Sequence, residues 1–283
     1  MILLGKPVAD AIMQQCLLDV AACREKTVVP ALAVIRVGNR EDDLAYERGI
    51  LKRAEGFGIS VKVHVLDECV PVDKLTALVT TLNQDPSVHG ILLFRPLPAH
   101  LEPYREQIES CVSPEKDVDA MTESSAAGVY LNSGTGFAPC TAEACLELLH
   151  HYGIGVDGKR VAVIGRSAVI GKPVSLMLLN ENATVTICHT HTKDIASITG
   201  QSDIIVSCAG KAGSLTADMV KDGQIILDVS VNASENGICG DMATECLEKD
   251  ISYTPVPRGI GSITSAVLMK HVVKACMLSI HEG

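Results

Sequence analysis

The sequence predicts an α/β protein with two domains, the second of which is a Rossmann-like dinucleotide-binding domain. Three observations lead to this fold class: strand and helix patterns alternate along the chain, the hydrophobic residues are mostly aliphatic, and a glycine turn follows an apolar strand in the second half. The chain has 283 residues, of which 47% are hydrophobic and only 3% aromatic. Aliphatic residues fill the buried strands of parallel sheets, and the length is sufficient for two domains.

In the first half of the chain, helical and extended patterns alternate. Hydrophobic periodicity predicts strands over 30–37, 59–66 and 90–93, and helices over 7–26, 42–56 and 73–83. Pro96, Pro98 and Pro103 then predict a rigid loop. A helix over 141–151 leads into the second half.

The second half contains strand patterns near Val161, Val185, Ile204 and Ile225. A long terminal helix over 263–281 is expected to return to the first domain. We therefore expect a first domain at 1–140, completed by the C-terminal helix 264–283, and a dinucleotide-binding domain at 141–263.

The segment 158–179 is the most informative part of the chain. An uncharged run at 161–164 reads as a buried strand, and Gly165, Arg166, Ser167 and Gly171 form a turn before a helical pattern. Such a turn directs backbone N–H groups and a helix N-terminus at a phosphate. The spacing is G-x-S-x-x-x-G instead of G-x-G-x-x-G, so this turn alone leaves an ordinary α/β connection open.

The next strand, 183–188, ends about 20 residues further on, where a residue that contacts the cofactor ribose is expected. An enzyme that prefers NAD usually carries Asp or Glu at this point, whereas this chain has His189, Thr190, His191 and Thr192. Arg166 is expected nearby. The pattern favours NADP and leaves NAD open.

Composition argues against several classes of partner. A net charge of −10 is unfavourable for binding nucleic acid or an acidic membrane surface. Eleven cysteines occur without a C-x-x-C pair, as expected of reduced thiols in a cytoplasmic protein. No apolar stretch reaches the ~18 uncharged residues that span a bilayer. Cys188, His189 and His191 suggest no fourth ligand, so we expect no metal site.

Several short motifs follow one another along the chain: Val37-Gly38-Asn39, Tyr46, Gly90-Ile91-Leu92-Leu93 with Pro96-Leu97-Pro98, the run 114–119, Pro139-Cys140-Thr141, Gly165-Arg166-Ser167, Asp228-Val229 with Asn232, and Pro255-Val256-Pro257 running to Thr264. In this order and spacing, the chain resembles the bifunctional methylenetetrahydrofolate dehydrogenase/cyclohydrolase (FolD) family over essentially its whole length.

The resemblance implies two domains with a cleft between them, NADP on the second domain and a folate in the cleft. The implied activity is NADP-dependent oxidation of 5,10-methylenetetrahydrofolate to the methenyl form, in one-carbon metabolism and purine biosynthesis, by a homodimer. It also implies that the cofactor is held by Gly165, Arg166, Ser167, Gly171, Thr190 and Val231, with Arg166 and Thr190 at the 2′-phosphate.

On the folate side, the resemblance implies a pocket formed by Tyr46, Ile50, Phe94, Asp119, Pro257, Arg258 and Gly259. Tyr46 and Asp119 are its candidate catalytic residues. Tyr46 would stack on or border the folate, and Asp119 would bind the pterin. A loop-capping role is the alternative for Asp119, since such carboxylates are common in turns.

Among the positions that depart from the family pattern, three bear on the chemistry. The family's S-x-x-Y-x-x-x-K motif has Ile50 in place of lysine, V-Q-L-P-L has Phe94 in place of glutamine, and P-G-G-x-G has Arg258 in place of glycine. The lysine and glutamine serve the cyclohydrolase step, and neither Ile nor Phe can move a proton. Lys52 faces about 200° away along the helix. We therefore expect a dehydrogenase with weak or absent cyclohydrolase activity.

Two other functions remain open from the sequence. One is a paralogue that binds NADP without catalysing a reaction. The other is an oxidoreductase on a different substrate, in which Arg258 anchors an anion.

Overall fold

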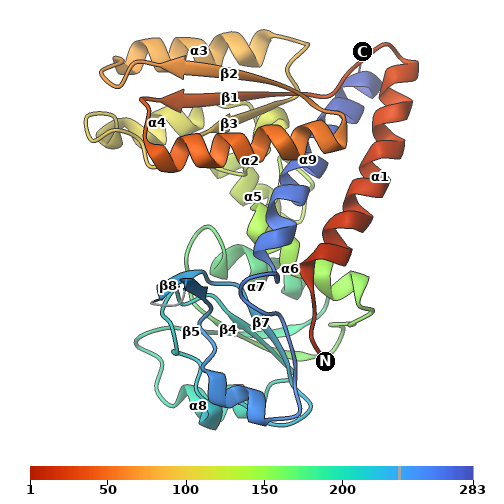
Figure 1. Cartoon of the computed structure of the whole chain (residues 1–283), viewed down its shortest axis with the longest axis vertical. Helices are drawn as coiled ribbons and strands as arrows, with labels where there is room; N and C mark the ends of the chain where they lie inside the picture. The colour runs from red at the N-terminus through yellow and green to blue at the C-terminus, as the bar shows by residue number, and fades with distance from the viewer. Residues whose placement is uncertain (235–236, 283) are drawn as a thin grey trace. The chain divides into compact units, whose positions relative to one another are not determined.

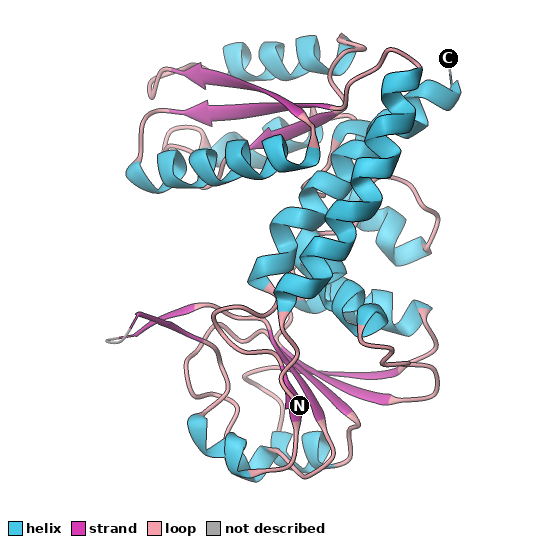
Figure 2. Cartoon of the chain, turned by 45° about the vertical axis from the view of Figure 1, so that its right-hand side comes forward, coloured by secondary structure: helices cyan, strands magenta, loops and turns pink. Residues whose placement is uncertain are grey.

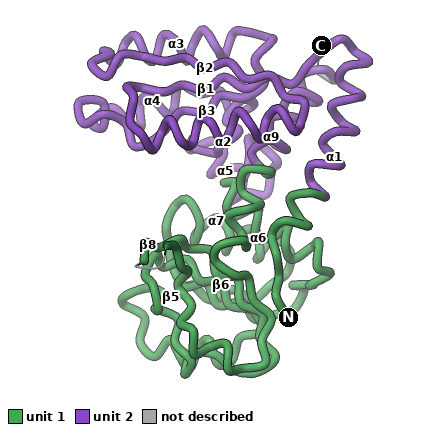
Figure 3. The backbone as a smooth tube through the Cα atoms, viewed as in Figure 1, with its two compact units in different colours: residues 1–10, 139–267 green, residues 11–138, 268–283 purple. Residues whose placement is uncertain are grey.

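The computed structural model describes residues 1–234 and 237–282, and the chain forms two compact units (Figure 3). Unit 1 contains residues 1–10 and 139–267, and unit 2 contains residues 11–138 and 268–283. The chain leaves unit 1 within helix α1 (Gly5–Glu25) and returns to unit 2 within helix α9 (Gly261–Glu282).

Unit 2 contains a three-stranded parallel sheet with strand order β2-β1-β3 (Figure 1). Its strands and helices include those expected from periodicity in the first half. They are β1 (Ala31–Val37), α2 (Glu41–Phe57), β2 (Ser60–Leu66), α3 (Val72–Gln84), β3 (Gly90–Leu93), α4 (Arg105–Ser110) and α5 (Glu123–Leu131). Short 3-10 helices at Glu102–Tyr104 and Pro114–Lys116 complete the unit.

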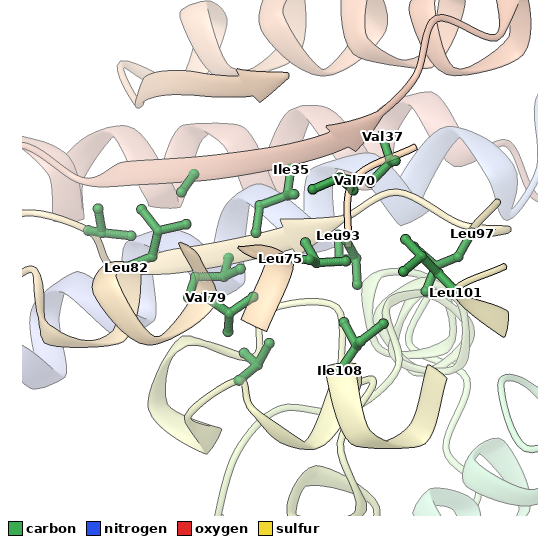
Figure 4. Packing of buried hydrophobic residues seen from close by; sticks show 14 residues of the cluster. Ile35, Val37, Val70, Leu75, Val79, Leu82, Leu93, Leu97, Leu101 and Ile108 are labelled. Carbon is green, nitrogen blue, oxygen red and sulfur yellow. The ribbon is translucent and has the colours of Figure 1, made fainter. Parts of the chain in front are cut away.

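The central strand β1 is buried on both faces, as a parallel strand between two helical layers should be. Ala33, Ile35 and Val37 point to one face and pack with the apolar residues of α3 and α4 (Figure 4). The alternating residue Arg36 points to the other face, where it pairs with Glu47 of α2. Helices therefore cover both faces of the sheet, and a ligand can approach the sheet only at the ends of its strands.

Unit 1 contains a five-stranded parallel sheet with strand order β10-β7-β6-β4-β5. Its elements are α6 (Cys140–His151), β4 (Arg160–Ile164), α7 (Gly171–Asn180), β5 (Thr184–Cys188), α8 (Ile195–Gly200), β6 (Ile204–Ser207), β7 (Ile225–Asp228) and β10 (Ser252–Tyr253), with 3-10 helices at Ala217–Met219 and Thr244–Glu248. The direction of chain progression reverses at β4, whose neighbours are β5 and β6. Ligands of open α/β sheets bind at the carboxyl ends of strands beside such a reversal.

The first ten residues belong to unit 1, whereas the sequence placed them in the first domain. They do so because the N-terminus extends the five-stranded sheet. Ile2 forms a parallel bridge with Tyr253. The amide of Leu3 donates to the carbonyl of Tyr253 (2.8 Å), and the amide of Tyr253 donates to the carbonyl of Met1 (3.0 Å). This pairing joins residues about 250 positions apart, so local patterns do not reveal it.

Sequence patterns also did not predict the small elements α5, α8, β10 and the antiparallel ribbon of β8 (Asn232–Ser234) and β9 (Gly237–Cys239). The ribbon stands apart from the five-stranded sheet of its unit (Figure 2). Helix α5 begins where the Thr122 hydroxyl accepts from the Ser125 amide (3.1 Å) and ends at Asn132, whose φ is 51°. Caps of this kind define a helix too short to show a clear period.

Helix α9 is long and apolar enough by composition to cross a membrane over Gly261–Ile280. However, 56% of that segment is buried inside the protein, as in the core helix of a globular fold. Length and composition therefore give only weak evidence for a membrane span.

The core of unit 2 should depend strongly on Ile91, which lies on β3 with no exposed surface. We expect Ile91→Ala to lower the free energy of unfolding by about 2–5 kcal/mol, because it removes buried methyl groups and leaves a cavity. Leu18→Ala, on the exposed side of α1, is the control and should change it by no more than about 0.5 kcal/mol. Urea unfolding followed by circular dichroism measures both, and equal losses would contradict this assignment of the core.

Candidate functional site

The turn after β4 lies at the reversal of the sheet in unit 1. Gly165 has a φ of 131°, and a Cβ there would lie 2.5 Å from the carbonyl oxygen of Cys208, which follows β6. A Cβ on Gly171 would overlap the carbonyl oxygen of Gly165. Both glycines therefore allow close backbone approach, and the turn is packed against the start of α7.

Ser167 organises this turn. Its hydroxyl oxygen accepts hydrogen bonds from the amides of Ile170 (3.1 Å) and Gly171 (3.4 Å). Arg166 and Ser167 are exposed, and among the described residues the Arg166 guanidinium has no ion-pair partner. A free cation next to a helix N-terminus and a glycine turn fits the phosphates of a dinucleotide.

The segment after β5 carries no acidic side chain before Asp194. The Thr192 hydroxyl accepts from the His189 amide (2.9 Å), which shapes the turn, and Thr190 is exposed. The rings of His189 and His191 lie 6.0 Å apart. Within the described part of the chain, no group of three or more His, Cys, Asp or Glu residues is arranged to hold a metal ion.

Asp241 is a buried residue of this region that sequence reasoning missed. Its carboxylate accepts hydrogen bonds from the end of β6, from the loops that follow β6 and β7, and from the start of β8. The donors are the Ser207 hydroxyl (3.1 Å), the amides of Ala209 (2.7 Å), Gly210 (3.3 Å) and Lys211 (2.9 Å), the Ser230 hydroxyl (2.8 Å) and the Asn232 side-chain amide (3.1 Å). Nearby, burial raises the pKa of Asp228 to about 6, although backbone amides oppose the rise. The donors lie 9 to 34 positions from Asp241 in the sequence, so no local pattern identifies it.

Val231 and the 257–259 loop also belong to unit 1. Val231 is 60% exposed just after β7, next to the residues that Asp241 holds. Pro257 and Arg258 are exposed and Gly259 is buried. Arg258 has a φ of 83°, a left-handed conformation that favours glycine, and its carbonyl accepts from the Gly5 amide (2.8 Å).

In unit 2 the candidate folate residues gather where β3 ends and α2 passes. The rings of Tyr46 and Phe94 lie 5.1 Å apart at an angle of 46°. Ile50 lies one helical turn after Tyr46 and is 1% exposed, and Phe94 is 5% exposed. Tyr46 is 49% exposed, so this wall is apolar and presents one aromatic ring to its surroundings.

Asp119 forms an ion pair that the sequence did not predict. The Arg95 guanidinium donates from Nη2 to Oδ2 of Asp119 (2.8 Å), and its Nη1 lies 3.5 Å from Oε1 of Glu109 on α4. Burial raises the pKa of Asp119, and the guanidinium opposes that rise. Burial likewise raises the pKa of Glu109, against Arg95 and Arg105. Arg95 is therefore the cation of this site.

The loop-capping role considered for Asp119 is performed by Asp117. The buried Asp117 carboxylate accepts from the amides of Met121 and Thr122 (both 2.9 Å) and from the hydroxyls of Thr122 and Ser125 (both 2.6 Å). Two residues on, Asp119 is directed to Arg95 instead. The two carboxylates of the D-V-D motif thus have separate tasks.

A cavity of about 700 Å³ in unit 2 lies away from these residues. Val28, His89 and Phe137 line it, and the first two precede β1 and β3. It therefore lies at the amino ends of the strands, whereas Phe94 and Arg95 follow a carboxyl end.

A glycine turn suited to phosphates in unit 1 and an apolar, aromatic wall beside an ion-paired carboxylate in unit 2 are the features expected of a dinucleotide-dependent oxidoreductase. The family model for the catalytic domain of tetrahydrofolate dehydrogenase/cyclohydrolase matches residues 3–119, and the model for its NAD(P)-binding domain matches residues 139–280. The chain belongs to this tetrahydrofolate dehydrogenase/cyclohydrolase family.

Individual relatives agree with this assignment. The chain is 44% identical over 279 residues to bifunctional protein FolD of Clostridioides difficile, covering 98% of this chain and 96% of the relative. The FolD crystal structure from Campylobacter jejuni superposes with a TM-score of 0.93 at 37% identity, covering 98% and 99% of the two chains. The Trypanosoma brucei enzyme, solved with NADP and an inhibitor, gives 0.88 at 33% identity, covering 99% and 98%. The predicted fold class, family and NADP cofactor are confirmed.

The Gly165–Gly171 contact should be needed for cofactor binding. In Gly171→Ala, the new methyl group would displace the turn that presents backbone amides, so we expect the Kd for NADPH to rise by at least about tenfold. Gly200→Ala is the control, because its Cβ would meet no atom within 4 Å. NADPH fluorescence titration measures both, and an unchanged Kd in Gly171→Ala would contradict the assignment.

The left-handed conformation of Arg258 has a cost in stability. We expect Arg258→Gly to raise the free energy of unfolding of the protein by up to about 1 kcal/mol, because glycine adopts φ = 83° without strain. Arg258→Ala removes the guanidinium and keeps the Cβ, so it should bring no such gain. Urea unfolding compares the two variants, and equal gains would assign the effect to charge instead of backbone strain.

Proposed function

We propose that this protein oxidises 5,10-methylenetetrahydrofolate with NADP and releases most of the product as 5,10-methenyltetrahydrofolate, because its cyclohydrolase step is weak. One observation supports this most directly. Ile50 and Phe94 are both apolar and buried at the positions where the family motifs have lysine and glutamine. The alternative functions are NADP binding without turnover, as in a non-catalytic paralogue, and oxidation or reduction of a different substrate.

The cofactor is proposed to bind at the turn of unit 1. The amides that Ser167 orders would contact the pyrophosphate, and Gly165 and Gly171 let the backbone approach it closely. Arg166 and Thr190 are exposed and suited to the 2′-phosphate. Bound NADP supplies the acceptor for the hydride.

The folate is proposed to bind against Tyr46 and Asp119 in unit 2. The half-exposed ring of Tyr46 offers a flat apolar surface for the folate, and its contact with Phe94 limits its freedom. Asp119 accepts hydrogen bonds from the pterin. Hydride loss from the methylene carbon is assisted by the folate's own nitrogen lone pair, so positioning supplies most of the catalysis.

Hydrolysis of the methenyl group makes a different demand, since a water molecule must lose a proton as it attacks. A lysine with a lowered pKa can carry that proton, but Ile50 has no ionisable group. Lys52 is exposed, whereas Ile50 is 1% exposed, so the two side chains face different environments. The cyclohydrolase step therefore lacks its proton carrier.

We also propose that the protein is a cytoplasmic homodimer that associates through unit 1. Strand β5 lies at the edge of the five-stranded sheet, with Ile187 39% exposed on it and Leu179 55% exposed on the preceding helix. An apolar sheet edge of this kind is commonly covered by a second chain.

A two-wavelength assay tests the proposed reaction. With methylenetetrahydrofolate and NADP, we expect NADPH to form and methenyltetrahydrofolate to accumulate, and added methenyltetrahydrofolate to decay no faster than in buffer. Enzymatic decay of the methenyl form would refute the loss of cyclohydrolase activity. Binding of NADP and folate without turnover would favour the paralogue, and no folate binding would favour a different substrate.

The double variant Ile50→Lys/Phe94→Gln tests the cause. It restores the lysine and its amide partner together, so we expect cyclohydrolase activity to rise by at least about tenfold with dehydrogenase activity within about fivefold of the parent. Leu51→Lys, which adds a lysine at an exposed neighbouring position, is the control and should show no gain.

A further inference from the structure

We propose that Arg95 is a positioning residue that holds Asp119 as an ionised acceptor for the pterin and thereby sets the affinity for folate. This inference rests on the proposed function, because it concerns the carboxylate assigned to the pterin. Arg95 stands where the family motif V-Q-L-P-L has leucine, so it is a further change beside Phe94.

The geometry places one guanidinium between two carboxylates. Arg95 follows β3 after Phe94, whose amide donates to the Ile35 carbonyl (3.0 Å) and thereby continues the sheet pairing. From this anchored position, Nη2 donates to Asp119 Oδ2 (2.8 Å) and Nη1 faces Glu109 (3.5 Å). The distance to Asp119 is typical of a charge-assisted hydrogen bond, and that to Glu109 is a looser ion pair.

The two carboxylates need this cation. The side chains of Glu109 and Asp119 are 14% and 24% exposed, and burial raises the pKa of both. The other charged or titratable groups acting on Asp119 are Asp117 in its own loop, which raises its pKa, and His271 of α9, which lowers it. Arg105 on α4 acts on Glu109. Arg95 has the largest stabilising effect on the Asp119 anion.

Ionisation of Asp119 matters because the pterin presents N–H donors from its 2-amino group and ring nitrogen. A carboxylate accepts two such bonds side by side, whereas a protonated carboxyl group replaces an acceptor with a donor. The bond from Arg95 uses one lone pair of Oδ2, which leaves Oδ1 and the remaining lone pair for the ligand. Arg95 would therefore orient the acceptor without occupying it.

The test compares Arg95→Leu, Arg95→Lys and Arg105→Leu in the full-length protein. In Arg95→Leu we expect the KM for methylenetetrahydrofolate to rise by at least about tenfold at neutral pH, with kcat and the KM for NADP within about threefold of the parent. Arg95→Lys should recover part of the loss. Arg105→Leu removes an exposed cation that acts on Glu109, and it should leave folate KM unchanged.

The pH profile separates positioning from a merely structural role. Arg95 lowers the pKa of Asp119, so its removal lets that pKa rise. Because folate binding requires the ionised form, the acidic limb of kcat/KM for folate should move to higher pH in Arg95→Leu and stay in place in Arg105→Leu.

The outcomes also separate this inference from the proposed function. Turnover by the parent with the same folate KM and pH profile in Arg95→Leu would overturn the role of Arg95 and leave the proposed function standing. If the parent binds tetrahydrofolate in a calorimetric titration without turnover, weaker binding by Arg95→Leu still supports the inference. A parent that neither binds nor oxidises folate would overturn both.

Discussion

In each unit, a buried carboxylate saturated with hydrogen-bond donors fixes the loops that carry the candidate site. Asp241 binds the loops after β6 and β7, and Asp117 binds the loop that leads from Asp119 into α5. A buried carboxylate without its donors costs several kcal/mol, so these loops have little freedom to open. Val231 and the ion-paired Asp119 are thus presented from loops held by many hydrogen bonds, as catalysis by positioning requires.

The distribution of positive charge in unit 2 differs from that implied by the family motifs. The lysine position on α2 is the buried, uncharged Ile50, while Arg95 brings a cation to the end of β3. An arginine cannot lose its proton at physiological pH, so it stabilises an anion but carries no proton. At these two positions the unit therefore has a cation at Arg95 and no titratable side chain at Ile50. A single lysine can both stabilise a bound anion and transfer a proton, whereas Arg95 can only stabilise the anion.

Much of the fold followed from sequence because its main elements have strong local patterns. Strands β1 and β3 are uncharged or nearly so and buried on both faces, and α2 and α3 have clear apolar periods, so each was predicted to within a few residues. The glycine turn at 165–171 was recognisable because its chemistry is local. By contrast, β10 exists through its pairing with β7 and the N-terminus, and two residues show no pattern of their own.

The same distinction applies to the site. Ile50 and Phe94 could be located by their place in motifs, but the ion pair of Arg95 with Asp119 joins residues 24 positions apart and depends on how the loop after β3 folds. The D-V-D motif likewise predicted a capping carboxylate without showing that Asp117 takes this role and frees Asp119. Interactions that depend on two distant loops were beyond sequence reasoning, even where both residues had been noted.

The apolar pair Ile50 and Phe94 is compatible with the proposed loss of cyclohydrolase activity in a folded protein that keeps the proposed dehydrogenase activity. Removing only the lysine would leave its amide partner buried without a hydrogen bond, whereas replacing both with apolar groups can be nearly neutral. Among the described residues, the buried side-chain nitrogen and oxygen atoms without a partner are His64 Nε2 and Ser214 Oγ, and neither belongs to this wall. The wall around Ile50 therefore contains no buried polar side-chain atom without a partner. Hydride transfer requires a positioned folate but no proton carrier, so an apolar wall is compatible with it.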